Sequence, residues 1–197
     1  MVHALSKFVA IPSVSQYPEN REDCRQAAIW LKQCLSQLGA RSSLVGIYAR
    51  TAMLNTSLVA ADRGWCQSTC ARNLHRYTRI ISKAKDPFLW VCFFIHVFDL
   101  ALRFHSHYDV ISAPPESWHS DPFTVKGKNG YLYGRGVNDN KGPILAIALA
   151  VANLLSHRAL TVDLIFLVEG EEECGSTGFE KAVKNHKVPY YEDGFFC

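Results

Sequence analysis

Apolar residues recur at helical spacing in residues 19–38, "ENREDCRQAAIWLKQCLSQL". One face of this predicted helix would carry the positions Cys24, Ala27, Ala28, Leu31, Leu35 and Leu38. Acidic residues in the first turn and Gly39 after the last turn are typical of helix ends. The next apolar segment, residues 41–47, is short enough to be a strand, so the pattern predicts a helix followed by a strand.

The same kind of pattern returns in the second half of the chain. Residues 130–136 alternate like a strand that runs into a turn, and residues 141–157 are rich in Ala and Leu like a buried helix. Residues 160–170 read as a strand buried on both faces, and residues 175–187 as a further helix. This alternation predicts the α/β class, with a mixed, largely parallel sheet flanked by helices.

Residues 46–102 show no clear helix or strand rhythm. The pattern there supports only a helix near 70–84 and a strand near 88–98. We therefore predict that this segment is poorly packed.

Composition is that of an ordinary globular protein, with 197 residues, 48% hydrophobic and 20% charged, which is enough for one domain with a core. Seven scattered cysteines do not form a disulfide framework, and the N-terminus lacks a secretory pattern, so we expect a cytoplasmic protein. The longest apolar run, residues 88–98, is well short of the ~20 residues that cross a bilayer, which argues against a membrane protein.

Charge is unevenly distributed along the chain. Residues 105–197 hold 12 acidic and 8 basic side chains, although the whole chain has a net charge of +3. An acidic excess in the segment that carries the polar motifs suits a cation site and argues against nucleic-acid binding.

Two short motifs place acids near a histidine or a turn. In "HSHYDV", Asp109 would lie beside His107 if both belong to a strand, and would then support His107 as a metal ligand. The alternative is a hydrogen-bonded His–Asp pair without a metal. In "GRGVNDNKGP", Asp139 stands just before a helix, where α/β proteins place ligands, but Asp139 or Asn140 could equally cap that helix.

A third motif, "EGEEECGS", crowds four carboxylates after an apolar strand that we expect to end at Val168, before a helix that begins near Gly175. The alternative is a solvated acidic turn that the helix dipole stabilises by only ~0.3–1 kcal/mol per charge. That small stabilisation does not explain why the glutamates are adjacent. One histidine with several carboxylates, gathered at one sheet edge, is a ligand set for Zn²⁺ or Mn²⁺, and a spare glutamate supplies the base that hydrolysis needs.

The segments "HYDVISAPPESWHSDPF", "GYLYGRGVNDNKGP" and "EGEEECGSTGFEKAV" resemble the first three signature blocks of the M20 family of zinc metallopeptidases. That family includes carnosine and Cys-Gly dipeptidases and glutamate carboxypeptidases. "DNKGP" and "EGEEECGS" are most similar to a fungal M20-like subunit of a glutathione-degrading complex. The resemblance is strong over residues 105–185 and moderate over residues 1–45.

The resemblance implies a role for each matched residue. His107 would bind the first of two zinc ions, Asp139 would bridge both, and Glu173 would bind the second. Asp109 would support His107, and Glu172 would be the general acid and base. The family's two further ligands, an aspartate and a second histidine, have no counterpart in this sequence.

We accordingly divide the chain into three parts. Residues 1–45 are the N-terminal part of an M20 catalytic domain, residues 46–104 are an atypical segment such as a translated intron, and residues 105–197 are the metal-site part, without the dimerisation domain. The expected function is zinc-dependent cleavage of dipeptides or of γ-glutamyl and Cys-Gly peptides, with this chain an inactive fragment. The partners would be a small peptide substrate and, for a full-length form, a second copy or a complex.

Two other functions stay open at this stage. One is a non-catalytic scaffolding or binding subunit of a glutathione-degrading, amidotransferase-like complex. The other is an unrelated cation-binding module, which would explain the carboxylates but not the order of the three motifs.

Overall fold

The computed structural model describes residues 1–47, 51–58, 101–160 and 162–185. Its strands are β1 Arg41–Ile47, β2 Thr51–Leu58, β3 Ala101–His107, β4 Lys126–Lys128, β5 Tyr131–Tyr133 and β6 Asp163–Glu169. Its α-helices are α1 Val2–Val9, α2 Arg21–Gln37, α4 Lys141–Ser156 and α5 Phe179–Asn185, and its 3-10 helices are η1 Pro18–Asn20, η2 Pro115–Ser117 and η3 Glu172–Cys174.

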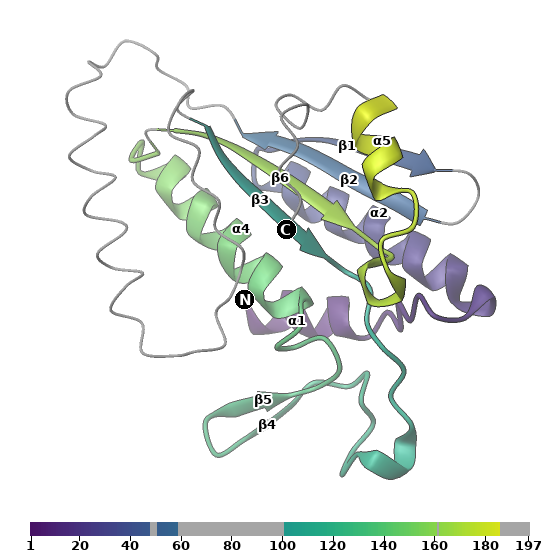
Figure 1. Cartoon of the computed structure of the whole chain (residues 1–197). Coiled ribbons are helices and arrows are strands. Elements are labelled where there is room, and N and C mark those ends of the chain that lie inside the picture. The colour runs from purple at the N-terminus through teal and green to yellow at the C-terminus, as the bar shows by residue number, and fades with distance from the viewer. Residues whose placement is uncertain (48–50, 59–100, 161, 186–197) are drawn as a thin grey trace.

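Four strands form the main sheet, in the order β1-β2-β6-β3 (Figure 1). The α/β class and the mixed sheet are confirmed, but of the three pairings within the main sheet only that of β3 with β6 is parallel. The expectation of a largely parallel sheet is therefore wrong for this part of the chain. Only residues 48–50 join β1 to β2, and a parallel connection needs a dozen or more residues. The helix α4 lies between β3 and β6 in the sequence and provides such a crossover.

The main core lies between the sheet and three helices. Buried side chains of α1, α2 and α4 join one cluster with Phe104 of β3 and with Leu164, Phe166 and Val168 of β6. Two aromatic stacks, Phe8 on Trp30 and Phe104 on Phe166, lie in this cluster or at its border. Leu167 points to the opposite face, where α5 packs: the Phe179 ring of α5 lies 4.5 Å from the ring of His105.

Several predicted elements are confirmed with shifts of a few residues. The strand at 41–47 matches β1, and the helix at 19–38 is α2 with the short η1 before it. The helix at 141–157 is α4 and the strand at 160–170 is β6. The helix expected at 175–187 begins later, because Gly175 and Gly178 adopt positive φ angles that delay α5 until Phe179.

The segment 46–102 contains structure that the sequence pattern did not predict. Strand β2 lies within it and pairs with both β1 and β6, and β3 begins at Ala101. Helix α1 was not predicted either. The helix expected near 70–84 and the strand expected near 88–98 lie outside the described residues.

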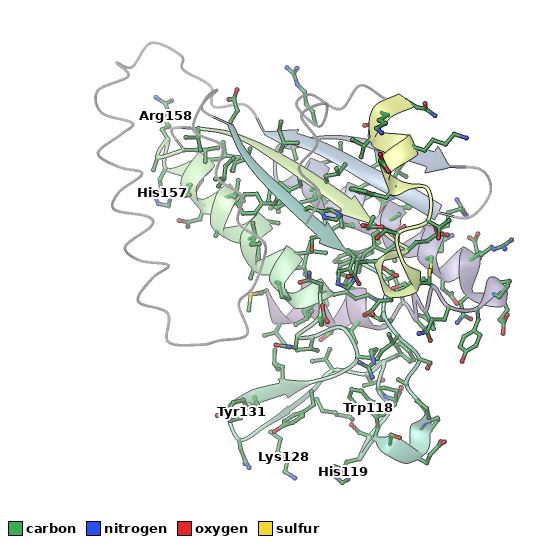
Figure 2. The ribbon with its side chains drawn as sticks, in the orientation of Figure 1. Trp118, His119, Lys128, Tyr131, His157 and Arg158 are labelled. Atoms are coloured by element: carbon green, nitrogen blue, oxygen red, sulfur yellow. The ribbon has the colours of Figure 1, made fainter. Side chains whose placement is uncertain are left out.

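The strands β4 and β5 form a separate hairpin that projects from the main sheet (Figure 2). Tyr131 and Tyr133 are exposed, while Leu132 between them packs against the core, as strand alternation requires. Beyond this hairpin the chain returns to the sheet edge through the turn that carries Asp139. Among the described residues, the helices are all too short or too polar to cross a membrane.

Candidate metal centre

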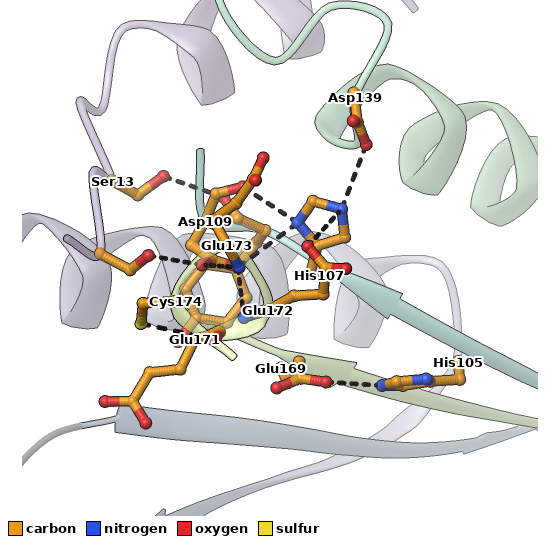
Figure 3. Close-up of polar contacts among 12 residues, drawn as sticks. Ser13, His105, His107, Asp109, Asp139, Glu169, Glu171, Glu172, Glu173 and Cys174 are labelled. Carbon is orange, nitrogen blue, oxygen red and sulfur yellow. Dashed lines mark hydrogen bonds and ion pairs between the residues drawn. The ribbon is translucent and has the colours of Figure 1, made fainter. Parts of the chain in front are cut away.

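His107 is the last residue of β3 and lies at the carboxyl edge of the parallel pair β3–β6, in register with Glu169. Its side chain is only 9% exposed. The ring nitrogen Nδ1 lies 3.1 Å from the backbone oxygen of Asp109 and 3.4 Å from its carboxylate. The other nitrogen, Nε2, lies 3.1 Å from Asp139 and 3.8 Å from Glu172, so it faces the acidic side chains (Figure 3).

Asp109 is fully buried and organises the acidic turn, which is the segment of residues 169–173. Its Oδ1 accepts the backbone N–H of Glu172 at 3.3 Å, and its Oδ2 accepts the N–H of Glu173 at 3.1 Å and the hydroxyl of Ser15 at 2.6 Å. The expected proximity to His107 is present, but Asp109 lies beyond the end of the strand. Its position therefore comes from these hydrogen bonds rather than from strand alternation.

The carboxylates of the acidic turn lie in different environments. Strand β6 extends to Glu169 rather than ending at Val168, and the buried Glu169 carboxylate lies 2.9 Å from Nε2 of His105. Glu171 precedes η3, and its side chain is directed away from His107 (Figure 3). The pair Glu172 and Glu173 lies within η3, a short helix that the sequence did not predict.

Glu172, Glu173 and His107 form a group of possible ligands. One ligand atom from each lies within 4.8 Å of the other two. Within the described residues this is the only such group of three or more His, Cys, Asp or Glu side chains. The exposed Cys174 is next in sequence, but its thiol lies 3.5 Å from the backbone oxygen of Glu171 and outside this group.

Asp139 also approaches His107, but it is not a member of this group of three. It precedes α4 on a tight turn. The turn packs closely on the start of the helix, because a Cβ at Gly142 of α4 would lie 1.9 Å from the carbonyl oxygen of Val137. The Asp139 side chain is 69% exposed and contacts Nε2 of His107 at 3.1 Å. Asn140 occupies the N-cap position of α4 without a side-chain capping bond, so the alternative that this acidic turn serves to cap the helix is not observed.

The electrostatics of the centre favour a positive charge on His107. Burial alone would lower the pKa of the imidazole. The hydrogen bond and charge of Asp109, together with the charges of Glu172 and Asp139, outweigh burial and raise the pKa of His107 to about 9. Burial and the neighbouring carboxylates also raise the pKa of Glu173. The charge of His107 opposes this rise in the pKa of Glu173 but does not cancel it.

The donor set fits a borderline dication. One imidazole nitrogen and several carboxylate oxygens, without a thiolate among them, are ligands that Zn²⁺ and Mn²⁺ accept. The nitrogen Nδ1 points to Asp109, which leaves Nε2 as the atom available to a metal. A metal-binding histidine commonly has such a carboxylate partner on its second nitrogen.

The fold and this donor set are those of a metallopeptidase domain. Residues 103–195 match the family described as Peptidase family M20/M25/M40, and this part of the chain belongs to that family. The probable di- and tripeptidase DUG2 of Saccharomyces cerevisiae is 31% identical over 189 residues, which cover 94% of this chain and 19% of that protein. The β-Ala-His dipeptidase of Rattus norvegicus is 43% identical over 95 residues, which cover 47% of this chain and 18% of that protein.

Solved structures show the same fold. Human carnosine dipeptidase 1 aligns with a TM-score of 0.70 and 26% identity, covering 99% of this chain and 36% of that one. An M20 family metallo-carboxypeptidase from Sulfolobus solfataricus aligns with a TM-score of 0.69 at 23% identity, and this likeness shows the fold alone. The chain thus spans about a fifth of the length of the curated relatives that it matches.

Sequence reasoning missed two features of this region. The pairing of His105 with Glu169 was not predicted, although His105 and His107 stand two residues apart, the spacing that puts both on one face of a strand. The burial of Lys141 was also missed. Its ammonium donates to the carbonyl oxygens of Phe8 and Ile11, which are distant in sequence.

Proposed function

We propose that the chain carries part of the active site of a zinc-dependent exopeptidase that cleaves dipeptides, with Cys-Gly and γ-glutamyl compounds as candidate substrates. The observation that carries this proposal is the convergence of His107, Glu172 and Glu173 around the buried carboxylate of Asp109. The M20 family match and the dipeptidase relatives support the peptidase reaction.

Each residue has a chemically suitable place in this scheme. His107 and Asp139 would hold one zinc ion, and Asp139 and Glu173 would hold a second. Asp109 would keep the proton of His107 on Nδ1 and leave Nε2 free for the metal. Bound dications would polarise the scissile carbonyl and acidify the attacking water.

Glu172 is the candidate general base. Its side chain is 47% exposed and lies 3.8 Å from Nε2 of His107, so it borders the ligands and remains accessible to water and substrate. A carboxylate in that position would accept the proton of the attacking water and deliver it to the leaving amine. Its backbone N–H is held by Asp109, which restricts the position of the side chain.

We propose further that the 197-residue chain alone is not a competent peptidase. Each zinc ion takes about four ligands, counting water. The proposed set gives each metal only two protein ligands, with Asp139 shared between the metals. Turnover would then require ligands beyond these residues. We propose likewise that the protein is cytoplasmic and that its full-length form is a dimer or a subunit of a complex.

Metal binding by the purified chain tests the central claim. Equilibrium dialysis against Zn²⁺ should show bound zinc that is lost in His107→Ala and strongly reduced in Glu173→Gln. The variant Glu180→Gln is the matched control, because Glu180 is exposed on α5 and pairs with Lys184. Wild-type zinc content in His107→Ala would refute the proposed centre.

The peptidase claim has its own test. A panel of dipeptides that includes Cys-Gly is incubated with the zinc-loaded chain, and no turnover is expected. Zinc-dependent turnover that Asp139→Ala abolishes would contradict the proposal that the chain alone is inactive. Zinc binding without turnover in a full-length form would instead favour a binding or scaffolding subunit.

A further inference from the structure

Residues 8–15, here called the N-terminal strap, comprise the last two residues of α1 and the segment that leads from it to the candidate metal centre. Lys141, which follows Asp139 by two residues, is fully buried and donates hydrogen bonds to the carbonyl oxygens of Phe8 at 3.0 Å and of Ile11 at 2.6 Å. An ammonium at the C-terminal end of a helix satisfies carbonyl groups that have no partner within the helix. The strap is therefore tied to the turn that bears Asp139.

The strap is also tied to the segment that follows His107. The hydroxyl of Ser13 donates to the carbonyl oxygen of Tyr108 at 2.9 Å, and the N–H of Val110 donates to the carbonyl oxygen of Ser13 at 3.0 Å. Val14 forms a parallel bridge with Val110. Ser13 is fully buried, so these bonds are shielded from water and fix the strap beside Asp109.

Ser15 occupies the position at which the strap meets the Asp109 carboxylate. Its hydroxyl donates to Oδ2 at 2.6 Å, the shortest of the three hydrogen bonds that this carboxylate accepts. The same oxygen atom accepts the N–H of Glu173. Oδ1 then accepts the N–H of Glu172 and lies 3.4 Å from the imidazole of His107. Rotation of the carboxylate would disturb every one of these contacts at once.

We propose that Ser15 is a positioning residue of the metal centre, which fixes the Asp109 carboxylate and through it the imidazole of His107 and the turn of Glu172 and Glu173. This inference rests on the proposed function for its effect on metal binding, but not for its effect on the turn. Ser15 does not belong to the group of ligand atoms and acts through Asp109, and its side chain also hydrogen-bonds to Cys174, the residue after Glu173.

The test compares Ser15→Ala with Ser15→Thr, which restores a hydroxyl at the same position. Ser6→Ala is the matched control, because the Ser6 hydroxyl is exposed and bonds only within α1, to the carbonyl oxygen of Val2. The first measurement is amide hydrogen exchange of Glu172 and Glu173 in the metal-free protein. We expect both amides to exchange at least about tenfold faster in Ser15→Ala, and at wild-type rates in Ser15→Thr and Ser6→Ala.

The second measurement is zinc affinity by competition with a chromophoric chelator. Loss of a partner behind a metal ligand typically weakens binding about 10- to 100-fold, and we expect Ser15→Ala to fall in that range, with Ser15→Thr close to wild type. The amides of β6 serve as the reference for global stability, so that a general loss of stability is recognised by faster exchange there too.

The two readouts separate the two claims. Unchanged exchange of Glu172 and Glu173 in Ser15→Ala, or equal acceleration throughout β6, would overturn the positioning role whether or not zinc binds. Faster exchange confined to the turn, in a protein whose wild type binds no zinc, would uphold the positioning of the turn and refute the metal centre. Unchanged zinc affinity in Ser15→Ala, while His107→Ala loses zinc, would overturn the claim that Ser15 supports the centre.

Discussion

Replacing His107 by glutamine should remove a pH-dependent part of the stability of the metal-free chain. Asp109 and the neighbouring carboxylates raise the pKa of His107 to about 9 in the folded protein, from an ordinary value of 6.5. Glutamine retains a hydrogen-bonding side chain of similar length but cannot take up the proton. The comparison therefore isolates the charge of the imidazolium.

The sign of the effect follows from the direction of the shift. A folded-state pKa above the unfolded value means that the folded protein binds the proton more tightly. The stabilisation is then present in full below about pH 6.5 and is lost as the pH rises through about 9. At about 1.4 kcal/mol per pH unit, the difference between 6.5 and about 9 corresponds to about 3 kcal/mol. The His107 side chain is only 9% exposed, so solvent screening reduces this value little.

Urea unfolding with a metal chelator present, between pH 6 and pH 10, measures the effect. The difference in unfolding free energy between wild type and His107→Gln should be largest at pH 6 and shrink by about 3 kcal/mol by pH 10. Burial lowers the pKa of Lys141 to about 7, but Lys141 is present in both proteins and its titration cancels in the difference. His157→Gln, at an exposed position at the C-terminus of α4, is the control substitution. A difference that is constant with pH, or that grows as the pH rises, would refute the reasoning.

Two further comparisons between variants test the acidic turn and its packing. In a full-length form, Glu172→Gln should remove most turnover and leave zinc content near normal, whereas Glu173→Gln should lose zinc; equal zinc loss in both would reverse their assigned roles. Gly170→Ala should destabilise the chain by about 1–3 kcal/mol in urea unfolding, because its Cβ would lie 2.2 Å from the hydroxyl oxygen of Tyr108. Gly127→Ala, where the nearest atom is 3.9 Å away, is the control, and equal stability of the two variants would contradict the packing argument.

Elements with a sustained pattern of apolar residues were predictable from the sequence. The α2 face formed by Cys24, Ala27, Ala28, Leu31 and Leu35 is buried as its spacing requires. The apolar run of β6 is buried on both faces over its last four residues, because α5 covers the side opposite the main core. Local pattern suffices for such elements, since their own side chains decide which face is buried.

Pairing and long-range anchoring could not be predicted in the same way. Strand β2 mixes polar and apolar residues, and its place between β1 and β6 depends on partners elsewhere in the chain. The buried Lys141 would be assigned to the surface by its type, yet carbonyl groups of the N-terminal strap accept its hydrogen bonds. The three motifs were correctly expected at one sheet edge, but the hydrogen bond from Ser15 that joins the N-terminal strap to them has no local signal.

Two of the acids crowded around η3 have their own polar partners, which compensate their charge separately. Glu169 has His105, and the buried Asp109 accepts two backbone N–H groups and a hydroxyl. Glu172, Glu173 and Asp139 remain, and His107 is the cation that the structure places among them. Burial first, and then the charges of the neighbouring carboxylates, raise the pKa of Glu173 despite the opposing charge of His107. A dication at Nε2 would replace that proton with a larger positive charge. In the proposed metal centre, the same carboxylates that oppose one another in the metal-free chain would then become its ligands.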